Sequence, residues 1–335
     1  MKALVLQKPG HASIETAPEP AVADQKVLLK VRMVGFCGSD LNSFRGLNPL
    51  VSFPRILGHE VCATVVDGGN GGLAAGTDVA LSPYTSCGQC AACRRGRPNA
   101  CQFNQTLGVQ RDGALTELIA MPADKLYPAT LTTKELCLVE PLTVGFHAVA
   151  RGRVASKDAV AILGCGGVGL GAVAASSSRG AKTICIDVED EKLDLAREAG
   201  GTITINTRRE SLHDRLAEIT EGQGPDVVIE AIGTPATFRA AVEEVAFTGR
   251  VVYIGYAKEH VSYETRLFVQ KELDILGSRN ALPEDFGAVI SLLEARKFPV
   301  DQAVSLTVPL EEAAEALRSW SENPSQFKKI MVSLD

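Results

Sequence analysis

The chain has 335 residues, is 45% hydrophobic, and carries a formal net charge of −6. This length favours two domains with sizeable cores, and the acidic balance excludes the basic surface that nucleic-acid binding requires. No apolar run is long enough to span a membrane, and the N-terminus MKALVLQKPGH lacks the apolar core of a signal peptide, which together predict a cytoplasmic protein without membrane partners.

The N-terminal region reads as short strands separated by turns. The expected strands are Met1–Leu6, Val27–Val34, Glu60–Val66 and Asp78–Leu81. This pattern is typical of a compact, mostly β domain.

Two motifs in this β region could carry chemistry. In GFCGSD, Cys37 stands between a strand and an expected helix start, where Ser39 or Asp40 could cap the helix. In GHE, His59 and Glu60 open the next strand. A single Cys or His is more often structural than a ligand, so the interpretation of both motifs depends on the other metal-ligating residues of the chain.

Four of the nine cysteines are crowded into one short lobe, at Cys87, Cys90, Cys93 and Cys101. In a cytosolic chain such a cluster indicates a metal rather than disulfides. The segment has little apolar content of its own, so a tetrahedral zinc ion with four sulfur ligands would hold it together, and its closed shell leaves no position for substrate. A [4Fe–4S] cluster, which also takes four cysteines, is the alternative.

Glu140 lies among apolar residues in the segment LVEPLTVGFHAV, which is expected to form a helix starting near Pro141. One interpretation is an acidic residue favoured by the positive end of the helix dipole. The other is a metal ligand, or a residue that supports one.

The most informative stretch is a glycine-rich turn between two expected strands. Ala159–Leu163 is apolar and of strand length, and Thr183–Ile186 forms the next strand. Between them Gly164, Gly166 and Gly169, with Gly167 and Val168 inside the turn, have the G-x-G-x-x-G spacing that lets a pyrophosphate approach the backbone at a helix N-terminus. Asp187 follows the second strand, where it can bind a ribose 2′-OH and repel a 2′-phosphate. The stretch predicts binding of NAD rather than NADP, although isolated glycine motifs are also found in ordinary turns.

Strands and helices alternate regularly from Ala159 to Leu276, which predicts a Rossmann fold: a doubly wound, parallel six-stranded sheet. Ile232–Gly233 and Ile254–Gly255 end two of these strands, where they could contact a cofactor or simply form turns. Arg279, in the motif GSRNA, could anchor oxygens of the cofactor or substrate, or form a surface ion pair. The remaining C-terminal residues are too few for a separate domain and are expected to complete the first one.

These motifs, in this order, resemble the zinc-dependent medium-chain alcohol and polyol dehydrogenases over nearly the whole chain. Glu140 in VEPL resembles the sorbitol dehydrogenase branch, and the overall pattern is similar to bacterial dehydrogenases of hexitols, hexitol phosphates and aldonic acids such as L-gulonate or L-galactonate. The resemblance implies a GroES-like catalytic domain of residues 1–149 and 277–335, a structural zinc lobe at residues 87–101, and an NAD-binding Rossmann domain of residues 150–276.

The resemblance also implies roles for individual residues. Two zinc ions are expected per chain, one in the four-cysteine lobe and one at Cys37 and His59 with Glu60 and Glu140 as carboxylate ligands. Which carboxylate, or water, completes the coordination of this catalytic zinc varies within the family, and charge counting predicts that one of them detaches when substrate binds. Ser39 matches the hydroxyl that starts the proton relay, and Asp40 matches a partner of His59. Asn42 departs from a frequent histidine and cannot titrate.

The expected activity is oxidation of a secondary alcohol in a polyol, sugar phosphate or aldonic acid by hydride transfer to NAD. Two alternatives remain open: a threonine-like or simple secondary alcohol as substrate, and a non-catalytic protein that binds NAD and zinc. The resemblance also implies a homodimer or homotetramer, for which Val251–Ile254 and Leu273–Leu276 would suit either an interface or a core.

Overall fold

The computed structural model describes residues 1–21 and 26–334, and the chain divides into two compact units. The first unit comprises Met1–Glu140, Ile290–Ala295 and Val300–Asp335, and the second comprises Pro141–Val289 and Arg296–Pro299. None of the helices among the described residues combines the length and apolar character needed to cross a membrane.

The division differs from the expected boundaries at residues 149 and 277. It passes through helix α3 (Thr133–Arg151), because the first half of this helix contacts one unit and the second half contacts the other. Cys137 donates its thiol hydrogen to the Glu60 carbonyl at 3.3 Å, whereas the glycine at 145 lies against the backbone of Ala172. Residues 277–289 also belong to the second unit.

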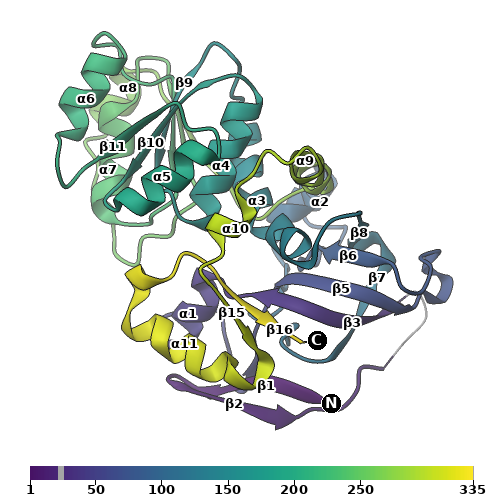
Figure 1. Ribbon diagram of the computed structural model, residues 1–335. Helices are drawn as coiled ribbons and strands as arrows, with labels where there is room; N and C mark the ends of the chain where they lie inside the picture. The colour runs from purple at the N-terminus through teal and green to yellow at the C-terminus, as the bar shows by residue number, and fades with distance from the viewer. Residues whose placement is uncertain (22–25, 335) are drawn as a thin grey trace. The chain divides into compact units, whose positions relative to one another are not determined.

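The first unit is built on two sheets (Figure 1). A seven-stranded sheet has the order β15-β16-β3-β5-β6-β8, with β7 paired to β3, and a three-stranded sheet has the order β2-β1-β4. The strands are β1 (Lys2–Lys8), β2 (His11–Thr16), β3 (Lys26–Gly35), β4 (Arg55–Ile56), β5 (Glu60–Asp67), β6 (Asp78–Leu81), β7 (Leu118–Pro122), β8 (Leu126–Pro128), β15 (Leu306–Pro309) and β16 (Ile330–Ser333). This unit also contains the start of α3, the end of α9 (Pro283–Glu294), and the helices α1 (Gly38–Phe44), α2 (Ala91–Arg94), α10 (Val300–Ala303) and α11 (Ala313–Glu322).

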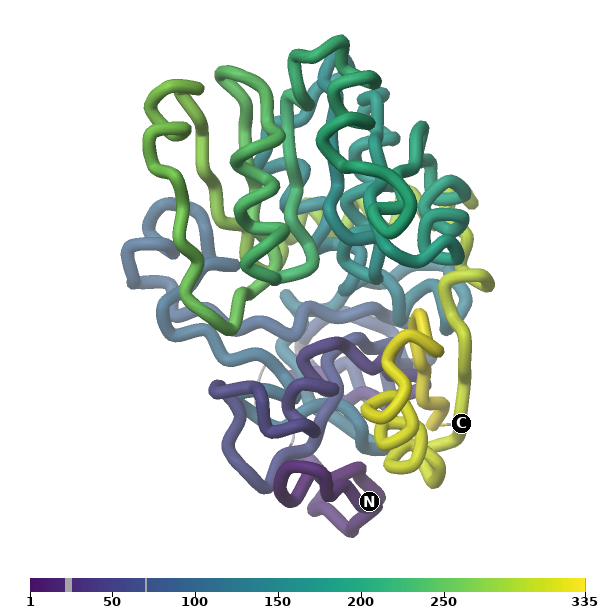
Figure 2. Tube along the Cα trace, turned by 90° about the vertical axis from the view of Figure 1, so that its left-hand side faces the viewer, coloured from purple at the N-terminus to yellow at the C-terminus, as the bar shows by residue number. Residues whose placement is uncertain are grey.

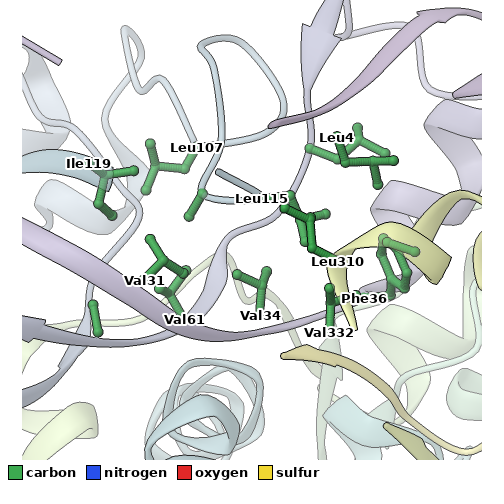
Figure 3. Close-up of a cluster of buried hydrophobic side chains, with 14 of the residues drawn as sticks. Leu4, Val31, Val34, Phe36, Val61, Leu107, Leu115, Ile119, Leu310 and Val332 are labelled. Atoms are coloured by element: carbon green, nitrogen blue, oxygen red, sulfur yellow. The ribbon is translucent and has the colours of Figure 1, made fainter. Parts of the chain in front are cut away.

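The core of the first unit forms between strands that are distant in sequence. Val31 and Val34 of β3 lie near Val61 of β5 and Val332 of β16 (Figure 3). All four side chains are buried. Strict alternation would separate Val31 from Val34, but the pairing of β3 with β5 shifts register between Val31 and Met33. The last strand lies within the sheet of the first unit, because β16 pairs antiparallel with β3.

The C-terminal helix of this unit also returns to its beginning. In Figure 2 the yellow segment that contains α11 lies beside the purple N-terminal segments, and α11 contacts both α1 and β2. A 3-10 turn at Leu310–Glu312 leads directly into α11.

The second unit is the predicted parallel six-stranded sheet, in the order β11-β10-β9-β12-β13-β14. The order reverses after β9, as it does in dinucleotide-binding folds. The strands are β9 (Ala159–Leu163), β10 (Lys182–Asp187), β11 (Ile203–Asn206), β12 (Val227–Glu230), β13 (Arg250–Tyr253) and β14 (Asp274–Gly277). The helices are the second half of α3, α4 (Gly167–Ser178), α5 (Asp190–Glu198), α6 (Leu212–Ile219), α7 (Pro235–Glu244), α8 (Arg266–Gln270) and most of α9 (Pro283–Glu294).

Candidate metal and cofactor sites

The four cysteines of the lobe converge on one point. The Sγ atom of Cys90 lies 3.5 Å from that of Cys93 and 3.9 Å from that of Cys101. A tetrahedral zinc ion with Zn–S bonds of about 2.3 Å separates its sulfurs by about 3.8 Å. All four ligand atoms, including that of Cys87, lie within 4.8 Å of one another. The donor set therefore fits a closed, four-sulfur zinc site.

Backbone amides stabilise the sulfurs as thiolates. Cys87 N donates to the sulfur of Cys101, and Cys90 N donates to the sulfur of Cys87, each at 3.3 Å. Backbone N–H groups, chiefly that of Cys93, lower the pKa of the Cys90 thiol to about 6. Metals bind the thiolate form, so the backbone of this lobe is already arranged for a cation.

The second metal-ligating group brings together two segments across paired strands. Cys37 follows β3, while His59 and Glu60 stand at the start of β5, and the pairing of Gly35 with Glu60 places the segments side by side. A Cβ atom at Gly35 would lie 2.3 Å from a carboxylate oxygen of Glu60, so any side chain there would displace this carboxylate. The ligand atoms of Cys37, His59 and Glu60 all lie within 4.8 Å of one another.

Asp40 links the two segments of this group. Its carboxylate accepts hydrogen bonds from Cys37 N at 2.8 Å and from Gly58 N at 3.4 Å, and one oxygen lies 3.9 Å from Nδ1 of His59. Burial opposes the charged imidazole, but the charges of Asp40 and Cys37 raise the pKa of His59 well above its usual value. The surroundings thus favour a positive charge, which a metal ion bound to neutral His59 would supply.

The start of α1 differs in detail from the sequence prediction. Cys37 is the N-cap residue, and Asp40 caps the helix from its third position by accepting the Cys37 amide. Ser39 lies in the first turn instead of at the cap. Its buried hydroxyl has no hydrogen-bond partner within the part of the chain that the structure describes. A hydroxyl without a partner beside a metal-ligating group is available to a substrate.

Glu60 has a second partner that the motifs do not indicate. Lys329, in the segment before β16, places its ammonium nitrogen 2.7 Å and 2.6 Å from the two carboxylate oxygens. The same nitrogen donates to the carbonyl of Phe36 at 3.1 Å. Burial opposes the charged lysine, but Glu60 raises the pKa of Lys329 above its usual value, so the pair remains ionic.

Glu140 lies in the middle of α3, and the prediction that it starts a helix is wrong. Pro141 stands inside the helix, where it removes one backbone donor without ending the helix. The buried Glu140 carboxylate accepts a hydrogen bond from the hydroxyl of Tyr84. Burial raises the pKa of Glu140 to about 6. The helix-dipole interpretation therefore does not apply, and Glu140 stands beside the metal-ligating group through its Tyr84 contact and its electrostatic interaction with His59.

In the second unit, each glycine of the G-x-G-x-x-G turn has a distinct environment. Gly164 has a φ of +97°, a conformation that residues with a side chain rarely adopt. A Cβ atom at Gly169 would lie 1.8 Å from the carbonyl oxygen of Gly164, so protein backbone leaves no room for a side chain here. A Cβ atom at Gly166 would meet no atom within 4 Å. Gly166 is therefore the position where space is left for a ligand, at the N-cap of α4 and just before Gly167 and Val168.

Asp187 is buried at the end of β10, next to this turn. Its carboxylate accepts backbone hydrogen bonds from Cys165 at 2.9 Å, Val188 at 2.7 Å and Glu189 at 3.1 Å. Three amide donors hold the carboxylate in one orientation. Asp187, the acidic residue that the motif requires, is thus hydrogen-bonded to the glycine turn through the amide of Cys165.

The two loops after β12 and β13 lie directly against each other. A Cβ atom at Gly255 would lie 2.4 Å from the amide nitrogen of Gly233, so the backbones meet without room for a side chain. Beneath them, the buried Oε1 atom of Glu230 accepts the amides of Ile232 at 2.9 Å and Gly233 at 2.7 Å. Ile254 N donates to the carbonyl of Glu230 at 2.9 Å. Arg279 follows β14 in the same unit.

Both halves of the chain match known families. Residues 23–131 match the alcohol dehydrogenase GroES-like domain, and residues 167–295 match the zinc-binding dehydrogenase family. An uncharacterized zinc-type alcohol dehydrogenase-like protein of Haemophilus influenzae is 35% identical over 335 residues, covering 98% of each chain. The chain belongs to the zinc-type medium-chain alcohol and polyol dehydrogenases.

Two relatives of this zinc-type dehydrogenase are named for polyhydroxylated substrates. L-galactonate-5-dehydrogenase of Escherichia coli is 31% identical, with 94% of each chain covered. Sorbitol dehydrogenase of Bacillus subtilis is 33% identical, with 99% of this chain and 97% of the relative covered.

Solved structures share the fold of this dehydrogenase. The rspB alcohol dehydrogenase of Escherichia coli, in complex with NADH, has a TM-score of 0.91 at 28% identity and covers 100% of this chain and 99% of its own. A Sinorhizobium meliloti dehydrogenase bound to NADP has a TM-score of 0.91 at 29% identity, covering 99% and 98%. The family and the α/β fold class predicted from the sequence are confirmed.

Sequence reasoning missed three residues of this dehydrogenase that touch predicted site residues: Tyr84, Lys329 and Glu230. Glu230 ends an apolar strand one position before the loop Ala231–Gly233, and a charge at the end of a buried strand could have signalled a role. Tyr84 and Lys329 stand in unremarkable surroundings in the sequence, and only the fold brings them to Glu140 and Glu60.

Proposed function

We propose that this dehydrogenase oxidises a secondary alcohol in a polyol, a sugar phosphate or an aldonic acid to the ketone, with zinc and NAD. The observation that carries the proposal is the buried group of Cys37, His59 and Glu60 beside the unpartnered hydroxyl of Ser39. A protein that only binds NAD and zinc does not require a proton-relay hydroxyl such as that of Ser39 beside its metal ligands. The combination argues against the non-catalytic alternative.

In the proposed site, Cys37, His59 and Glu60 would hold the metal, and Glu140 would be available as a further carboxylate ligand. The four-cysteine lobe would hold the second, structural zinc. A bound zinc ion supplies Lewis acidity, which lowers the pKa of an alcohol. Ser39 accepts the hydroxyl proton of the substrate and passes it on, and Asp40 orients the His59 ring. Asn42 cannot titrate, so the proton leaves through water or a ribose hydroxyl.

The cofactor is proposed to lie over the glycine turn, with its pyrophosphate at Gly166, Gly167 and Val168, between Gly164 and Gly169. The amides at the start of α4 would bind its oxygens. The Asp187 carboxylate would bind the adenosine ribose and disfavour a 2′-phosphate, which supports NAD over NADP. Ile232–Gly233, Ile254–Gly255 and Arg279 are proposed to contact the rest of the dinucleotide, so that the hydride of the alcohol carbon passes to its nicotinamide.

We further propose that the protein acts in the cytoplasm as a homodimer or homotetramer. Strand β14 lies at the edge of its sheet, and Ile275 of this strand is 41% exposed while the nearby Val269 is 84% exposed. An edge strand offers unpaired backbone groups, and exposed apolar side chains favour burial. Light scattering on the purified protein measures its mass, and a monomer would refute this point.

The activity is tested by following NADH formation with a panel of polyols, aldonates, hexitol phosphates and threonine. The expected result is turnover of one polyhydroxylated class that a zinc chelator abolishes and that NADP supports poorly. Turnover of threonine alone would show that the substrate is an amino alcohol instead of a polyol, a sugar phosphate or an aldonic acid. No turnover of any alcohol by protein that holds zinc and binds NAD would refute the proposal.

A further inference from the structure

The loop between Leu107 and Ala114 lies against the segment that carries a predicted metal ligand. Gly113 N donates to the Ile56 carbonyl at 2.8 Å, and Ala114 N donates to the Gly58 carbonyl at 2.9 Å. A Cβ atom at the glycine in position 108 would lie 2.7 Å from the amide nitrogen of Gly58. Both ends of the loop therefore rest on the residue that precedes His59.

Arg111 stands within this loop and has only one partner among the described residues. One terminal nitrogen of its guanidinium donates to the Pro83 carbonyl at 3.1 Å. Its Nε atom is buried without a hydrogen-bond partner, and no carboxylate in the described part of the chain pairs with it. Burial lowers the pKa of Arg111 from its usual value, with no acidic neighbour to offset the effect. A half-buried cation without a counter-ion is costly unless something supplies one.

A neighbouring arginine, Arg55, has the counter-ion that Arg111 lacks, although its Nε atom is also buried without a hydrogen-bond partner among the described residues. Arg55 pairs with Asp112 at 3.0 Å and donates to the hydroxyl of Ser52 at 2.8 Å. Asp112 follows Arg111 directly, yet its carboxylate is engaged by Arg55 and by the amide of Ile56. The nearest acid in the sequence is therefore committed elsewhere, and the charge of Arg111 remains uncompensated.

The anchor of Arg111 connects it to the predicted catalytic group. Pro83, whose carbonyl binds the guanidinium, precedes Tyr84, and the hydroxyl of Tyr84 contacts the carboxylate of Glu140. On its other side, the loop rests on Gly58. The guanidinium of Arg111 therefore binds the neighbour of Tyr84, and its loop contacts the neighbour of His59. Both connections lead to residues near the proposed metal site.

We propose that Arg111 binds an anionic group at one end of the polyhydroxylated substrate, either the carboxylate of an aldonate or the phosphate of a polyol phosphate. A planar guanidinium matches both anions with two parallel hydrogen bonds. Substrate binding supplies the missing counter-ion and places the chain of hydroxyl groups along the site. This inference rests on the proposed function and narrows it to anionic substrates.

The test compares Arg111→Met and Arg111→Lys with the wild-type enzyme, loaded with zinc and NAD. The probes are L-galactonate, galactitol 1-phosphate and the uncharged hexitol sorbitol. Charge-assisted hydrogen bonds of this kind predict a fall in kcat/KM of about 10- to 100-fold for the preferred anion, mostly through KM. Arg111→Lys, which keeps the charge without the planar fork, is expected to recover part of the loss. Oxidation of sorbitol should change by less than about threefold.

Arg55→Met is the matched control, because it removes an arginine from the same region that already has its counter-ion. Arg55→Met should change kcat/KM by the same factor for all three substrates. Equal losses for charged and uncharged probes in Arg111→Met would show that Arg111 only supports the Pro83 backbone, and a wild-type preference for sorbitol would equally overturn the inference. The better of the two anionic probes identifies whether the site takes a carboxylate or a phosphate.

A binding measurement separates this inference from the proposed function. Titration calorimetry of the two anions into the protein loaded with zinc and NADH needs no turnover. Binding by the wild type that is lost in Arg111→Met supports the anion site even if the enzyme oxidises none of the probes. Absence of binding, or binding that Arg111→Met leaves unchanged, refutes it.

Discussion

The ammonium group of Lys329 lies within 2.7 Å of both carboxylate oxygens of Glu60, and both side chains are buried. This pair changes the charge balance of the predicted catalytic metal group. A divalent ion with one thiolate and two carboxylates carries a net charge of −1. Lys329 offsets one negative charge, but the buried carboxylate of Asp40, 3.9 Å from Nδ1 of His59, adds one. The total with both neighbours is again −1, so we still expect one carboxylate to detach when substrate binds.

Replacing Lys329 with methionine should destabilise the metal-free protein and strengthen its binding of zinc. The change leaves the Glu60 carboxylate buried and uncompensated, which costs about 3–5 kcal/mol, and a metal ion can then replace the lost cation. Chemical unfolding of the metal-free protein and chelator competition for zinc measure the two effects. Lys329→Arg, which keeps the charge, should stay close to wild type. Unchanged zinc affinity in Lys329→Met would contradict this role of the pair.

Replacing Cys93 with serine should remove one zinc ion from the protein. The Sγ atom of Cys93 is 3.5 Å from that of Cys90, and loss of one thiolate opens the closed four-sulfur shell. Elemental analysis should show a fall from two zinc ions per chain to one, with faster proteolysis within residues 87–101. Cys185→Ala, which changes a buried cysteine of the second unit, serves as the control. Two zinc ions retained by Cys93→Ser would refute the assignment of this lobe.

Replacing Gly166 with alanine should weaken cofactor binding without affecting stability. The added methyl group meets no protein atom within 4 Å, and the backbone at this position suits any residue. NADH affinity should fall at least about tenfold because the methyl group stands where the pyrophosphate approaches, whereas the midpoint of thermal unfolding should hold.

Gly169→Ala is the matched contrast. Its methyl group would lie 1.8 Å from the Gly164 carbonyl oxygen, so overpacking should cost about 1–3 kcal/mol of stability. Fluorescence titration with NADH and thermal unfolding of both variants separate the two roles. Tight NADH binding by Gly166→Ala would place the cofactor elsewhere.

Replacing Glu230 with alanine should weaken both the cofactor loops and cofactor binding. Oε1 of Glu230 accepts two loop amides and the hydroxyl of Thr237 at 2.7 Å. Their loss should lower the free energy of unfolding by about 2–4 kcal/mol and raise the dissociation constant of NADH. Glu230→Gln keeps one acceptor oxygen and should retain most of the affinity. If Glu230→Ala binds NADH as well as wild type, the loops do not depend on this carboxylate.

Local patterns were sufficient to predict the parallel six-stranded sheet and the mostly β character of the first unit. The G-x-G-x-x-G spacing, the alternation of strands and helices, and the crowded cysteines each depend on neighbours a few residues apart, where backbone geometry follows directly from sequence. For this reason β9 has the predicted bounds, Ala159–Leu163.

Long-range contacts were decided only by the tertiary structure. Lys329 reaches Glu60 because β16 pairs with β3, and Arg111 is left without an acid because Asp112 pairs with Arg55. The interior position of Glu140 in α3 depends on a helix that continues through Pro141. Such contacts join residues far apart in the chain, and their charges balance or remain unbalanced only once packing excludes water from them.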